Sequence, residues 1–435
     1  GLSLVGSEMC IRDSNNSRVI AHNAICLVAL EKYTLSESLF PSETSESSFA
    51  KSLTYGSLRF YHHLNDVITP RLKKTLDKKN LDIHILIIMG AYQLIYTDVS
   101  THAAINETVE VAEKIKKQWA KGLINAILRG IDRDRDDILN TPHYSHPSWL
   151  VKKIMKEYPD NFHKIFTENN KQAPMSLRVH PSINIKSYQD KLLEGGIESK
   201  TSKIAPQSLT LNKAVNVEKL PDFRDGSCYV QDTSAQLAGQ LIAPKNGELI
   251  LDACCAPGGK TTHLAELCPN SEILALDADE KRLIKVNDNI KRLKNKNVKV
   301  ILGDATKGDW WNQRLFDKIL VDAPCTGTGV IRRHPDIKLI RKPRDLSHIV
   351  EVQASILKNL WLMLKPGGIL VYATCSILKD ENENQISKFI NLNMDSSIEE
   401  IRVPWGKGPI GKQQLPNDIF DGFYYAQLRK KSKSK

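Results

Sequence analysis

The 435-residue sequence lacks an apolar segment long enough to cross a membrane. Spanning a bilayer takes about 20 consecutive apolar residues, and the longest apolar stretch, residues 83–96, is interrupted by His84, Gly90 and Gln93. This stretch instead predicts a buried helix of a globular protein. A chain of this length also exceeds what one hydrophobic core supports, so we expect two or three domains and no membrane partner.

Cysteines are few and are not arranged in pairs. The eight cysteines include no Cys-x-x-Cys spacing, and the adjacent Cys254 and Cys255 are poorly placed to bind one zinc ion. A secreted domain held by disulfides would show a denser and more regular pattern. We therefore predict free thiols, no metal site, and a reducing, cytoplasmic setting.

Positive charge is unevenly distributed along the chain. Residues 1–150 hold equal numbers of basic and acidic side chains, so the formal net charge of +11 comes entirely from residues 151–435. A basic surface favours a polyanionic partner, of which nucleic acid is the commonest. A basic protein without such a partner would have the same composition, so charge alone leaves both interpretations open.

The chain divides into regions of different character. Residues 1–14 do not begin with Met and show no helical periodicity, and we interpret them as a non-native remnant. Residues 15–145 form one predicted domain, whose pattern is helical throughout from about Val19 to Arg129. A charged stretch and two X-Pro pairs near residues 132–147 mark a boundary. Residues 146–230 predict a mixed α/β connecting subdomain, with a helix near residues 150–158 and a strand near residues 175–179.

Short apolar runs alternate with helical segments in the last region, residues 231–435. The predicted strands are residues 249–251, 273–276, 298–302, 319–321 and 369–372, and the predicted helices include residues 261–267, 280–293 and 347–364. This alternation predicts a parallel sheet covered by helices on both faces, a doubly wound, Rossmann-like α/β fold. Ligands of such sheets bind beyond the carboxyl ends of the strands.

Acidic residues stand at the ends of four predicted strands: Asp252, Asp277, Asp304 and Asp322. Because these strand ends meet at one edge of the sheet, we expect the carboxylates to converge on one crevice. Asp277 is spaced as an acid that binds ribose hydroxyls, and Asp304 can accept a hydrogen bond from an exocyclic amine such as that of adenine. The sequence therefore predicts a nucleoside-containing cofactor.

A glycine-rich turn, residues 253–262, joins the first of these strands to a helix. Its backbone N–H groups and the helix N-terminus can approach a carboxylate or a phosphate. The turn matches neither GxGxxG nor GxxxxGK[ST], which argues against a nicotinamide cofactor and against a nucleoside triphosphatase. Lys260 in this turn either contacts the cofactor or holds the loop or an acid.

Two cysteines follow strands of the same sheet. Cys325 comes three residues after Asp322, and Cys375 ends the run Ala-Thr-Cys. A position at the strand ends beside an acid favours thiol chemistry. Buried cysteines more often serve as small apolar residues, and this is our interpretation of Cys26, Cys228 and Cys268.

A thiol is the group that methylation of cytosine at carbon 5 requires. Carbon 5 is a poor nucleophile, but addition of a thiolate at carbon 6 converts the ring to an enamine with electron density at carbon 5. An acid such as Asp322, hydrogen bonded at ring nitrogen 3, would favour this addition. After methyl transfer from a sulfonium, the carbon 5 proton leaves and the thiol is eliminated. One cysteine can begin the reaction and a second can help to end it, and the order of residues does not say which does which.

Several segments are shared with one known family: LDACCAPGGKTTH, LVDAPCTGTGVIRRHPDIK, LVYATCS, MGAYQLIYTDVSTHAAINETVE, KGLINAILR, HPSWL, VQDTSAQ and DGFYYAQL. Over nearly its whole length the chain resembles the bacterial small-subunit ribosomal RNA methyltransferase B family of RNA cytosine-5 methyltransferases. It departs from the family at Cys255, where alanine is common, and in a variant Thr326-Gly327 pair. The resemblance implies a NusB-like, all-α RNA-binding domain at residues 15–145, followed by a methyltransferase domain that uses S-adenosyl-L-methionine.

The resemblance also assigns roles to individual residues. It implies that Cys375 is the nucleophile and that Cys325 assists product release, with Asp322 activating the cytosine. Together with Arg282, the expected cofactor-binding residues are Cys254, Cys255, Ala256, Pro257, Gly258, Gly259, Lys260, Asp277, Asp304 and Asp322.

A basic run follows Cys325 in the sequence. It includes Arg332, Arg333, His334 and Lys338. A solvated helix face has the same composition, but beside an active-site loop we predict that these residues contact RNA phosphates and position a flipped target base. The helical domain would recognise RNA shape or dock on the catalytic domain.

We therefore predict a monomeric enzyme that methylates carbon 5 of a cytosine in small-subunit (16S) ribosomal RNA through a covalent cysteine adduct. One alternative keeps the chemistry but takes transfer RNA as the substrate. The other is a noncatalytic RNA-binding factor of ribosome assembly that retains a cofactor-binding fold.

Overall fold

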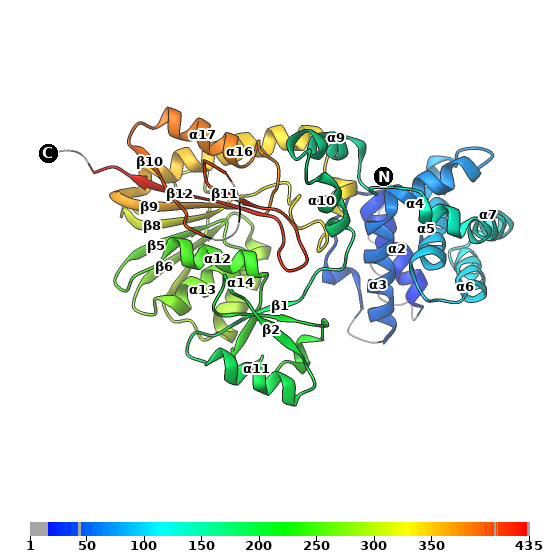
Figure 1. Cartoon of the computed structure of the whole chain (residues 1–435), viewed down its shortest axis with the longest axis horizontal. Helices are drawn as coiled ribbons and strands as arrows, with labels where there is room; N and C mark the ends of the chain where they lie inside the picture. The colour runs from blue at the N-terminus through cyan, green and yellow to red at the C-terminus, as the bar shows by residue number, and fades with distance from the viewer. Residues whose placement is uncertain (1–15, 42–44, 404–405, 407, 433–435) are drawn as a thin grey trace. The chain divides into compact units, whose positions relative to one another are not determined.

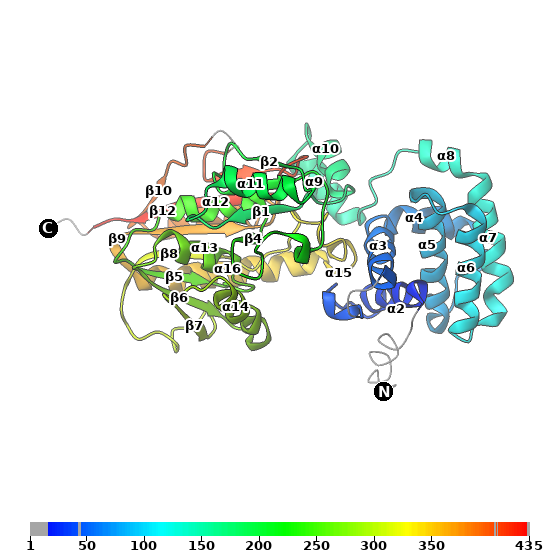
Figure 2. The same cartoon turned by 90° about the horizontal axis from the view of Figure 1, so that it is seen from below.

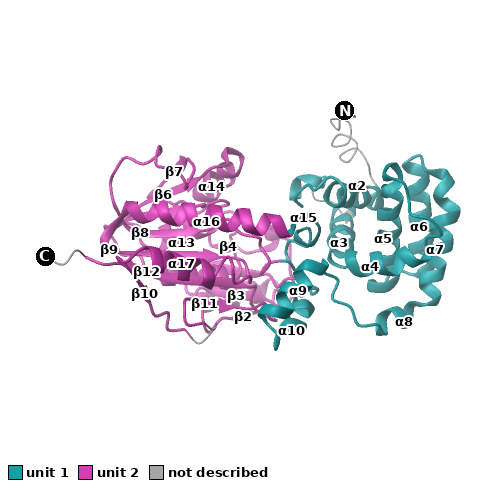
Figure 3. Cartoon of the chain, turned by 90° about the horizontal axis from the view of Figure 1, so that it is seen from above, with its two compact units in different colours: residues 1–171, 331–342 teal, residues 172–330, 343–435 magenta. Residues whose placement is uncertain are grey.

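The computed structural model describes residues 16–41, 45–403, 406 and 408–432. The chain forms two compact units, which Figure 3 colours separately. Unit 1 comprises Gly1–Lys171 and Ile331–Lys342, and unit 2 comprises Gln172–Val330 and Pro343–Lys435. The segment predicted to be a non-native remnant, residues 1–14, lies outside the described residues. None of the described helices is long and apolar enough to cross a membrane.

Unit 1 is helical, and its described residues form no strand. Its α-helices are α2 (Ser17–Ala29), α3 (Ser45–Arg59), α4 (Tyr61–Ile68), α5 (Leu81–Tyr96), α6 (Thr101–Lys114), α7 (Lys121–Arg133), α8 (Arg135–Asn140), α9 (Ser148–Glu157), α10 (Phe162–Asn169) and α15 (Ile337–Ile340). Its 3-10 helices are η1 (Glu37–Leu39), η2 (Thr69–Arg71), η3 (Lys78–Asn80) and η4 (Gln118–Ala120). This arrangement confirms the all-α fold predicted for the first part of the chain.

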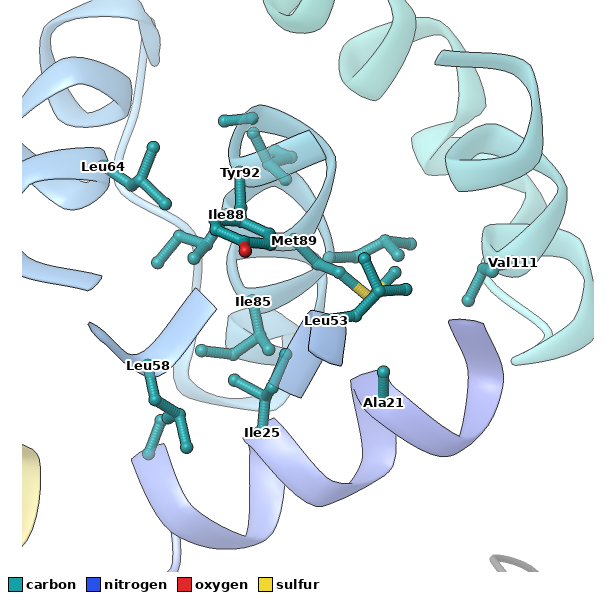
Figure 4. Packing of buried hydrophobic residues seen from close by; sticks show 14 of the residues in the cluster. Ala21, Ile25, Leu53, Leu58, Leu64, Ile85, Ile88, Met89, Tyr92 and Val111 are labelled. Atoms are coloured by element: carbon teal, nitrogen blue, oxygen red, sulfur yellow. The ribbon is translucent and has the colours of Figure 1, made fainter. Parts of the chain in front are cut away.

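Helix α5 forms the centre of unit 1 because it is apolar on every side. All of residues 85–95 are buried, and α2, α3, α4, α6 and α7 pack around the helix. Figure 4 shows Ile85 and Ile88 of α5 in one cluster with Ile25 of α2 and Leu53 of α3. A helix that is hydrophobic all round needs neighbours on all sides, and the predicted buried helix is confirmed.

Two segments beyond the predicted helical domain cluster with unit 1. Helices α9 and α10 cluster with unit 1, and the start of the connecting subdomain at residue 146 stays a prediction. Helix α15 contacts α2 and α3, so the chain leaves unit 2 after Val330 and returns to it at Pro343. A boundary between compact units that depends on packing between distant segments cannot be read from local composition.

Unit 2 begins with a small antiparallel sheet of strand order β2-β3-β1-β4. Its elements are β1 (Ser176–Val179), α11 (Ile185–Glu194), β2 (Ser199–Thr201), β3 (Ser208–Leu211), η5 (Val217–Lys219) and β4 (Cys228–Val230). Arg178 of β1 is buried, forms an ion pair with Glu266 and donates a 2.6 Å hydrogen bond to the carbonyl oxygen of Gly259. Through this side chain the small sheet is attached to the helix that follows the glycine-rich turn.

The large sheet has the order β10-β12-β9-β8-β5-β6-β7, with β11 paired to β12. Strands β7, β6, β5, β8 and β9 are parallel, whereas β10, β11 and β12 join by antiparallel pairs. Its strands are β5 (Leu249–Ala253), β6 (Glu272–Asp277), β7 (Val298–Leu302), β8 (Phe316–Asp322), β9 (Leu364–Thr374), β10 (Ser396–Glu399), β11 (Lys412–Gln414) and β12 (Phe423–Lys430). The five predicted strands are all present, and the antiparallel edge was not predicted.

Helices cover both faces of the large sheet. They are α12 (Thr233–Ile242), α13 (Gly259–Leu267), α14 (Glu280–Arg292), α16 (Pro343–Met363) and α17 (Glu383–Leu392). Leu249 and Leu251 of β5 share a core with α16 and α17, whereas Ile250 between them packs with α12 and α13. Side chains of a strand alternate between faces, and Figure 1 shows the two helix pairs on opposite sides of the sheet.

The order of the parallel strands reverses between β5 and β8. From β5 the chain passes outward to β6 and β7, and it then crosses back to β8 and β9 on the other side, an order that can be followed in Figure 2. Such a reversal opens a crevice at the carboxyl ends of the two central strands. The predicted site residues follow these strand ends.

Candidate active site

The two predicted reactive cysteines meet at the carboxyl ends of β8 and β9. Cys325 follows the end of β8 and Cys375 follows the end of β9. These strands are parallel neighbours, with Asp322 paired in register with Ala373. The two loops therefore emerge side by side, and the two Sγ atoms lie 3.3 Å apart although 50 positions separate the residues.

Lys260 and Asp322 form a charged pair in the same crevice. Lys260 Nζ donates a 2.7 Å hydrogen bond to Asp322 Oδ2, and the two side chains are 11% and 27% exposed. Burial opposes the charge of Lys260, but the charge of the Asp322 carboxylate and the hydrogen bond to it outweigh burial and raise the lysine pKa above its usual value. Of the roles left open for Lys260, the structure supports holding an acid.

Glu381 is a site residue that the sequence analysis missed. Its buried carboxylate accepts hydrogen bonds from the backbone N–H of Thr326 at 2.7 Å, from the Thr326 hydroxyl at 2.6 Å and from the Ser376 hydroxyl. One carboxylate thus ties the loop after Cys325 to the loop after Cys375. In the sequence Glu381 stands just before a helix, where acidic residues are common because they interact favourably with the helix dipole. The local sequence therefore does not mark Glu381 as a site residue.

The two thiols have different electrostatic surroundings. A hydrogen bond with Cys375 and burial raise the pKa of Cys325 well above its usual value, and the negative charge of Glu381 acts in the same direction. Cys325 is therefore suited to remain a thiol and to donate its S–H to the Cys375 sulfur, which lies 3.3 Å away.

The glycine-rich turn is anchored to β6. Gly258 has a φ of +95°, and a Cβ there would lie 3.2 Å from the Cα of Val286. Cys255 N–H donates to the carbonyl oxygen of Leu276 at 3.0 Å. The Pro257 ring and the Gly258 and Gly259 backbone complete the turn into α13. Burial raises the pKa of the Cys254 and Cys255 thiols, so neither is disposed to act as a nucleophile.

Asp277 and Arg282 brace the same turn. Asp277 Oδ2 accepts a 3.0 Å hydrogen bond from Ala256 N–H, and its Oδ1 accepts one from Asp279 N–H at 3.1 Å. Arg282 donates to the Ala256 carbonyl oxygen at 2.6 Å and lies 3.6 Å from Asp277. Asp277, Arg282 and the turn are thus brought together, as the predicted cofactor site requires.

Asp304 follows β7 and is more open. Its side chain is 40% exposed and accepts hydrogen bonds from the N–H and the hydroxyl of Thr306. Burial opposes its charge, but these hydrogen bonds and Lys307 lower the pKa of Asp304 below its usual value. It is therefore an ionised acceptor at the edge of the crevice.

Asp252 is a buried acceptor with spare capacity. Its Oδ2 accepts from the Thr261 hydroxyl at 2.6 Å, while Oδ1 has no hydrogen-bond partner among the described residues. Burial raises the pKa of Asp252 to about 7. The strand-end carboxylates outnumber the cations Lys260 and Arg282, so these hydrogen-bond acceptors fit the cationic and hydroxyl-bearing S-adenosylmethionine. In the described part of the chain, no group of three or more His, Cys, Asp or Glu residues is arranged to hold a metal ion.

The basic run predicted to bind RNA belongs to unit 1 and is largely packed within it. Arg332 and Lys338 are each 1% exposed. Lys338 Nζ donates to the carbonyl oxygen of Arg59 at 2.7 Å and to Asn170 Oδ1 at 2.6 Å. This burial argues against phosphate contacts by Arg332 and Lys338, because a buried side chain cannot reach a ligand in solvent. Their neighbours in the run, Arg333 and His334, are partly or fully exposed.

Known proteins show which family has this arrangement. Residues 239–429 match the family model described as 16S rRNA methyltransferase RsmB/F. Residues 15–133 match the NusB family, and residues 146–218 match the ferredoxin-like domain of RsmF/B-like methyltransferases. A ribosomal RNA small subunit methyltransferase B of Salmonella typhi is 41% identical over 433 residues, which cover 97% of this chain and 100% of that protein. The chain belongs to the ribosomal RNA small subunit methyltransferase B family.

Two solved structures share the fold of this methyltransferase B family member. PH0851 matches with a TM-score of 0.79 and 25% identity, over 96% of this chain and 100% of that one. A methyltransferase homolog protein from Pyrococcus horikoshii matches with a TM-score of 0.59 and 28% identity, over 68% of this chain and 98% of that one.

Membership of the methyltransferase B family confirms several predictions. The chain is an S-adenosylmethionine-dependent RNA methyltransferase, with a NusB-like domain ahead of a Rossmann-like methyltransferase domain. Its family acts on ribosomal RNA, and the noncatalytic alternative is set aside.

Proposed function

We propose that this enzyme transfers a methyl group to carbon 5 of a specific cytosine in 16S ribosomal RNA through a covalent adduct with Cys375. The observation that supports it best is the meeting of the two thiols, whose Sγ atoms lie 3.3 Å apart, at the strand ends that also carry the Lys260–Asp322 pair. The hydrogen bond with Cys375 and burial raise the pKa of Cys325. A nucleophilic thiol with a second, protonated thiol beside it is what addition to a pyrimidine ring and later release need.

The reaction begins at carbon 6 of the cytosine. Cys375 Sγ forms a bond to carbon 6, and the electron pair of the C5–C6 double bond shifts into the ring toward nitrogen 3. The Lys260 ammonium is the protonated member of the Lys260–Asp322 pair, and its proton passes through the Asp322 carboxylate to nitrogen 3, which keeps negative charge from building up on the ring. S-adenosylmethionine, held by the glycine-rich turn and Asp277, would supply an electrophilic methyl group for the electron-rich carbon 5 and would leave as the neutral thioether.

The reaction ends when the sulfur leaves. The proton on carbon 5 passes to water, its electron pair restores the C5–C6 double bond, and the bond between Cys375 Sγ and carbon 6 breaks. The proton on nitrogen 3 returns to the Lys260–Asp322 pair. The Cys325 thiol, 3.3 Å from the departing sulfur, can donate a hydrogen bond that stabilises it, which accounts for a role of Cys325 in release.

Single substitutions of the two cysteines test these roles. Cys375→Ala should abolish methylation of unmodified 16S ribosomal RNA, whereas Cys325→Ala should still attack the base and accumulate a covalent protein–RNA adduct. Denaturing gels of each variant incubated with this RNA and S-adenosylmethionine measure both outcomes. An adduct that requires Cys325 rather than Cys375 would reverse the assignment.

Transfer RNA with the same chemistry is the competing substrate. The relatives' name, ribosomal RNA small subunit methyltransferase B, favours ribosomal RNA. Bisulfite mapping of total RNA from cells with and without the gene distinguishes the two, because it reads both the base and its position. Loss of 5-methylcytosine from transfer RNA alone would replace the proposed substrate.

A further inference from the structure

Unit 2 has a groove that none of the predicted cofactor or cysteine residues lines. Its volume is about 920 Å³. One wall is formed by residues 200–204 and 210–214, around β2 and β3 of the small sheet, and another by residues 418–420, ahead of β12. The methyl-transfer chemistry described above makes no use of it.

Unpaired positive charge lines the small-sheet wall. Lys200, Lys203 and Lys213 are all exposed. In the part of the chain that the structure describes, their ammonium groups have no hydrogen-bond or ion-pair partner. The acid among the lining residues, Asp418, lies on the other wall. Like charges gathered in a concave surface repel one another and attract a polyanion.

Two apolar side chains follow Asp418 on the opposite wall. Ile419 is 48% exposed, and Phe420 beside it is partly exposed. Single-stranded nucleic acid is bound with little sequence preference by a combination of two features. Lysines bind its phosphates, and an aromatic ring across from them stacks on a base. A small apolar ligand would not need the lysines, and a duplex would not offer a free base to the ring.

Short backbone contacts connect the groove to the cysteine loops. Gly422, two residues past Phe420, donates from its N–H to the carbonyl oxygen of Gly329 at 2.8 Å, and Gly329 donates to the carbonyl oxygen of Cys375 at 2.9 Å. A Cβ on Gly329 would lie 2.1 Å from the Gly422 oxygen, so this approach requires glycine. One wall of the groove is therefore the continuation of the segment that packs on the Cys375 loop.

We propose that this groove binds the single-stranded RNA segment that flanks the target cytosine. Phosphates contact Lys200, Lys203 and Lys213, and one base stacks on Phe420. A cytosine turned out of its stack toward the sulfurs leaves its neighbours in the strand close to the crevice, and the segment from Phe420 to Gly422 runs from the groove to the Cys375 loop. The inference rests on the proposed function, because it takes RNA as the substrate. It adds a binding site for the part of the strand beside the reacting base.

A charge-removal variant with a matched control tests the groove. Lys200→Ala, Lys203→Ala and Lys213→Ala together should weaken binding of a fluorescein-labelled oligouridine to the full-length protein roughly tenfold, measured by anisotropy. The slope of log Kd against log salt should fall by about 2, since each phosphate contact on a single strand contributes about 0.7. The control removes the same charge from exposed sites on β7, α16 and α17: Lys299→Ala, Lys358→Ala and Lys388→Ala. It should bind like the unaltered protein.

A second variant separates stacking from charge. Phe420→Leu keeps an apolar side chain but removes the flat ring, so binding of the same oligouridine should weaken severalfold while the salt slope stays unchanged. With 16S ribosomal RNA as substrate, the lysine variant should show a raised KM and a nearly unchanged kcat.

The remaining outcomes test the groove assignment and separate it from the proposed reaction. Equal losses in the lysine variant and its control would mean that only overall charge matters, and the groove assignment would be wrong. Unchanged oligouridine affinity in the lysine variant would also overturn it, and the groove would then take another occupant, such as a protein segment. Methylation by the unaltered protein is scored independently, so its absence together with impaired oligouridine binding would keep the groove and reject the proposed reaction.

Discussion

The two compact units bury a lysine in different ways. In unit 2, Lys260 is paired with the carboxylate of Asp322, which keeps it charged. In unit 1, Lys338 donates to the neutral oxygens of Arg59 and Asn170, and burial together with the Arg59 guanidinium lowers its pKa well below the usual value. A buried lysine paired with a carboxylate stays charged and is available for chemistry, whereas a buried lysine that donates to neutral oxygens joins segments of the chain. Substitution of Lys260 should therefore change activity, and substitution of Lys338 should change stability.

The largest effect is expected at Lys260. Lys260→Met removes the ammonium that donates to Asp322 and leaves this carboxylate without its partner, so kcat should fall about 100-fold. Adduct formation should slow as well, because the ammonium that supplies the proton for nitrogen 3 is gone. Single-turnover rates of adduct formation measure this loss. A Lys260→Met enzyme that forms the adduct at the unaltered rate would contradict the role given to this lysine.

Glu381 should come next, because it positions both sulfurs without touching the substrate. Glu381→Ala leaves the Thr326 N–H and the hydroxyls of Thr326 and Ser376 without their acceptor, at a cost of about 1–3 kcal/mol for each buried group left unpaired. We expect a lower melting temperature and a fall in kcat of roughly tenfold.

A conservative variant separates positioning from simple folding. Glu381→Gln keeps an acceptor oxygen and should recover most of the stability. If Glu381 positions the sulfurs, the rate of adduct formation per folded molecule should still be reduced in Glu381→Ala at a temperature where both variants are fully folded. Equal rates in the two variants would make Glu381 a structural residue only.

The parallel part of the fold is readable from the sequence. Apolar runs at residues 249–251, 273–276 and 319–321 are each too short for a helix and alternate with amphipathic segments, and they became β5, β6 and β8. The strands that were missed are different in kind. Strands β2, β4 and β11 have only three residues each, which is too few to show a period of two. Their pairing depends on distant partners that local pattern does not show.

The same distinction applies to the site. The meeting of Cys325 and Cys375 could be anticipated because both follow strands of one parallel sheet. Glu381 and Arg178 could not, since their partners Thr326 and Glu266 lie 55 and 88 positions away. The sequence alone does not distinguish a buried charged residue whose partner is distant from a charged residue that is exposed to solvent. For the same reason the basic run containing Lys338 suggested an RNA contact, although the structure buries that side chain.

Asp252 offers a smaller effect, expected mainly in stability. Its pKa in the folded protein is raised by burial from 3.8 to about 7, so between these values the folded protein retains a proton that the unfolded chain releases. The contribution of this residue to stability therefore falls as pH rises from about 4 to about 7 and is constant above that range.

An isosteric variant isolates this contribution. Asp252→Asn can still accept from the Thr261 hydroxyl but cannot ionise, so it should melt at a higher temperature than the unaltered protein above pH 7, with a smaller difference near pH 4. It should also bind S-adenosylmethionine more weakly, because a buried acceptor in the crevice has lost its charge. Thermal unfolding at both pH values and calorimetric titration with the cofactor measure the two effects, and identical melting differences at both pH values would contradict the shifted pKa.

The smallest effect on activity is expected at Lys338, and here the sign of the pH dependence reverses. The folded-state pKa of this lysine lies well below 10.5, so between that pKa and about 10.5 the unfolded chain binds a proton that the folded protein lacks. The contribution of Lys338 to stability therefore rises with pH across this window. Lys338→Met should remove this rise of stability with pH and change the free energy of unfolding by about 1 kcal/mol at neutral pH. Its kcat and KM for 16S ribosomal RNA should match those of the unaltered enzyme, because a side chain that is 1% exposed has no surface to offer a phosphate. A raised KM with unaltered melting would instead mean that Lys338 leaves its buried position to contact RNA, and the contrast between the two lysines would no longer hold.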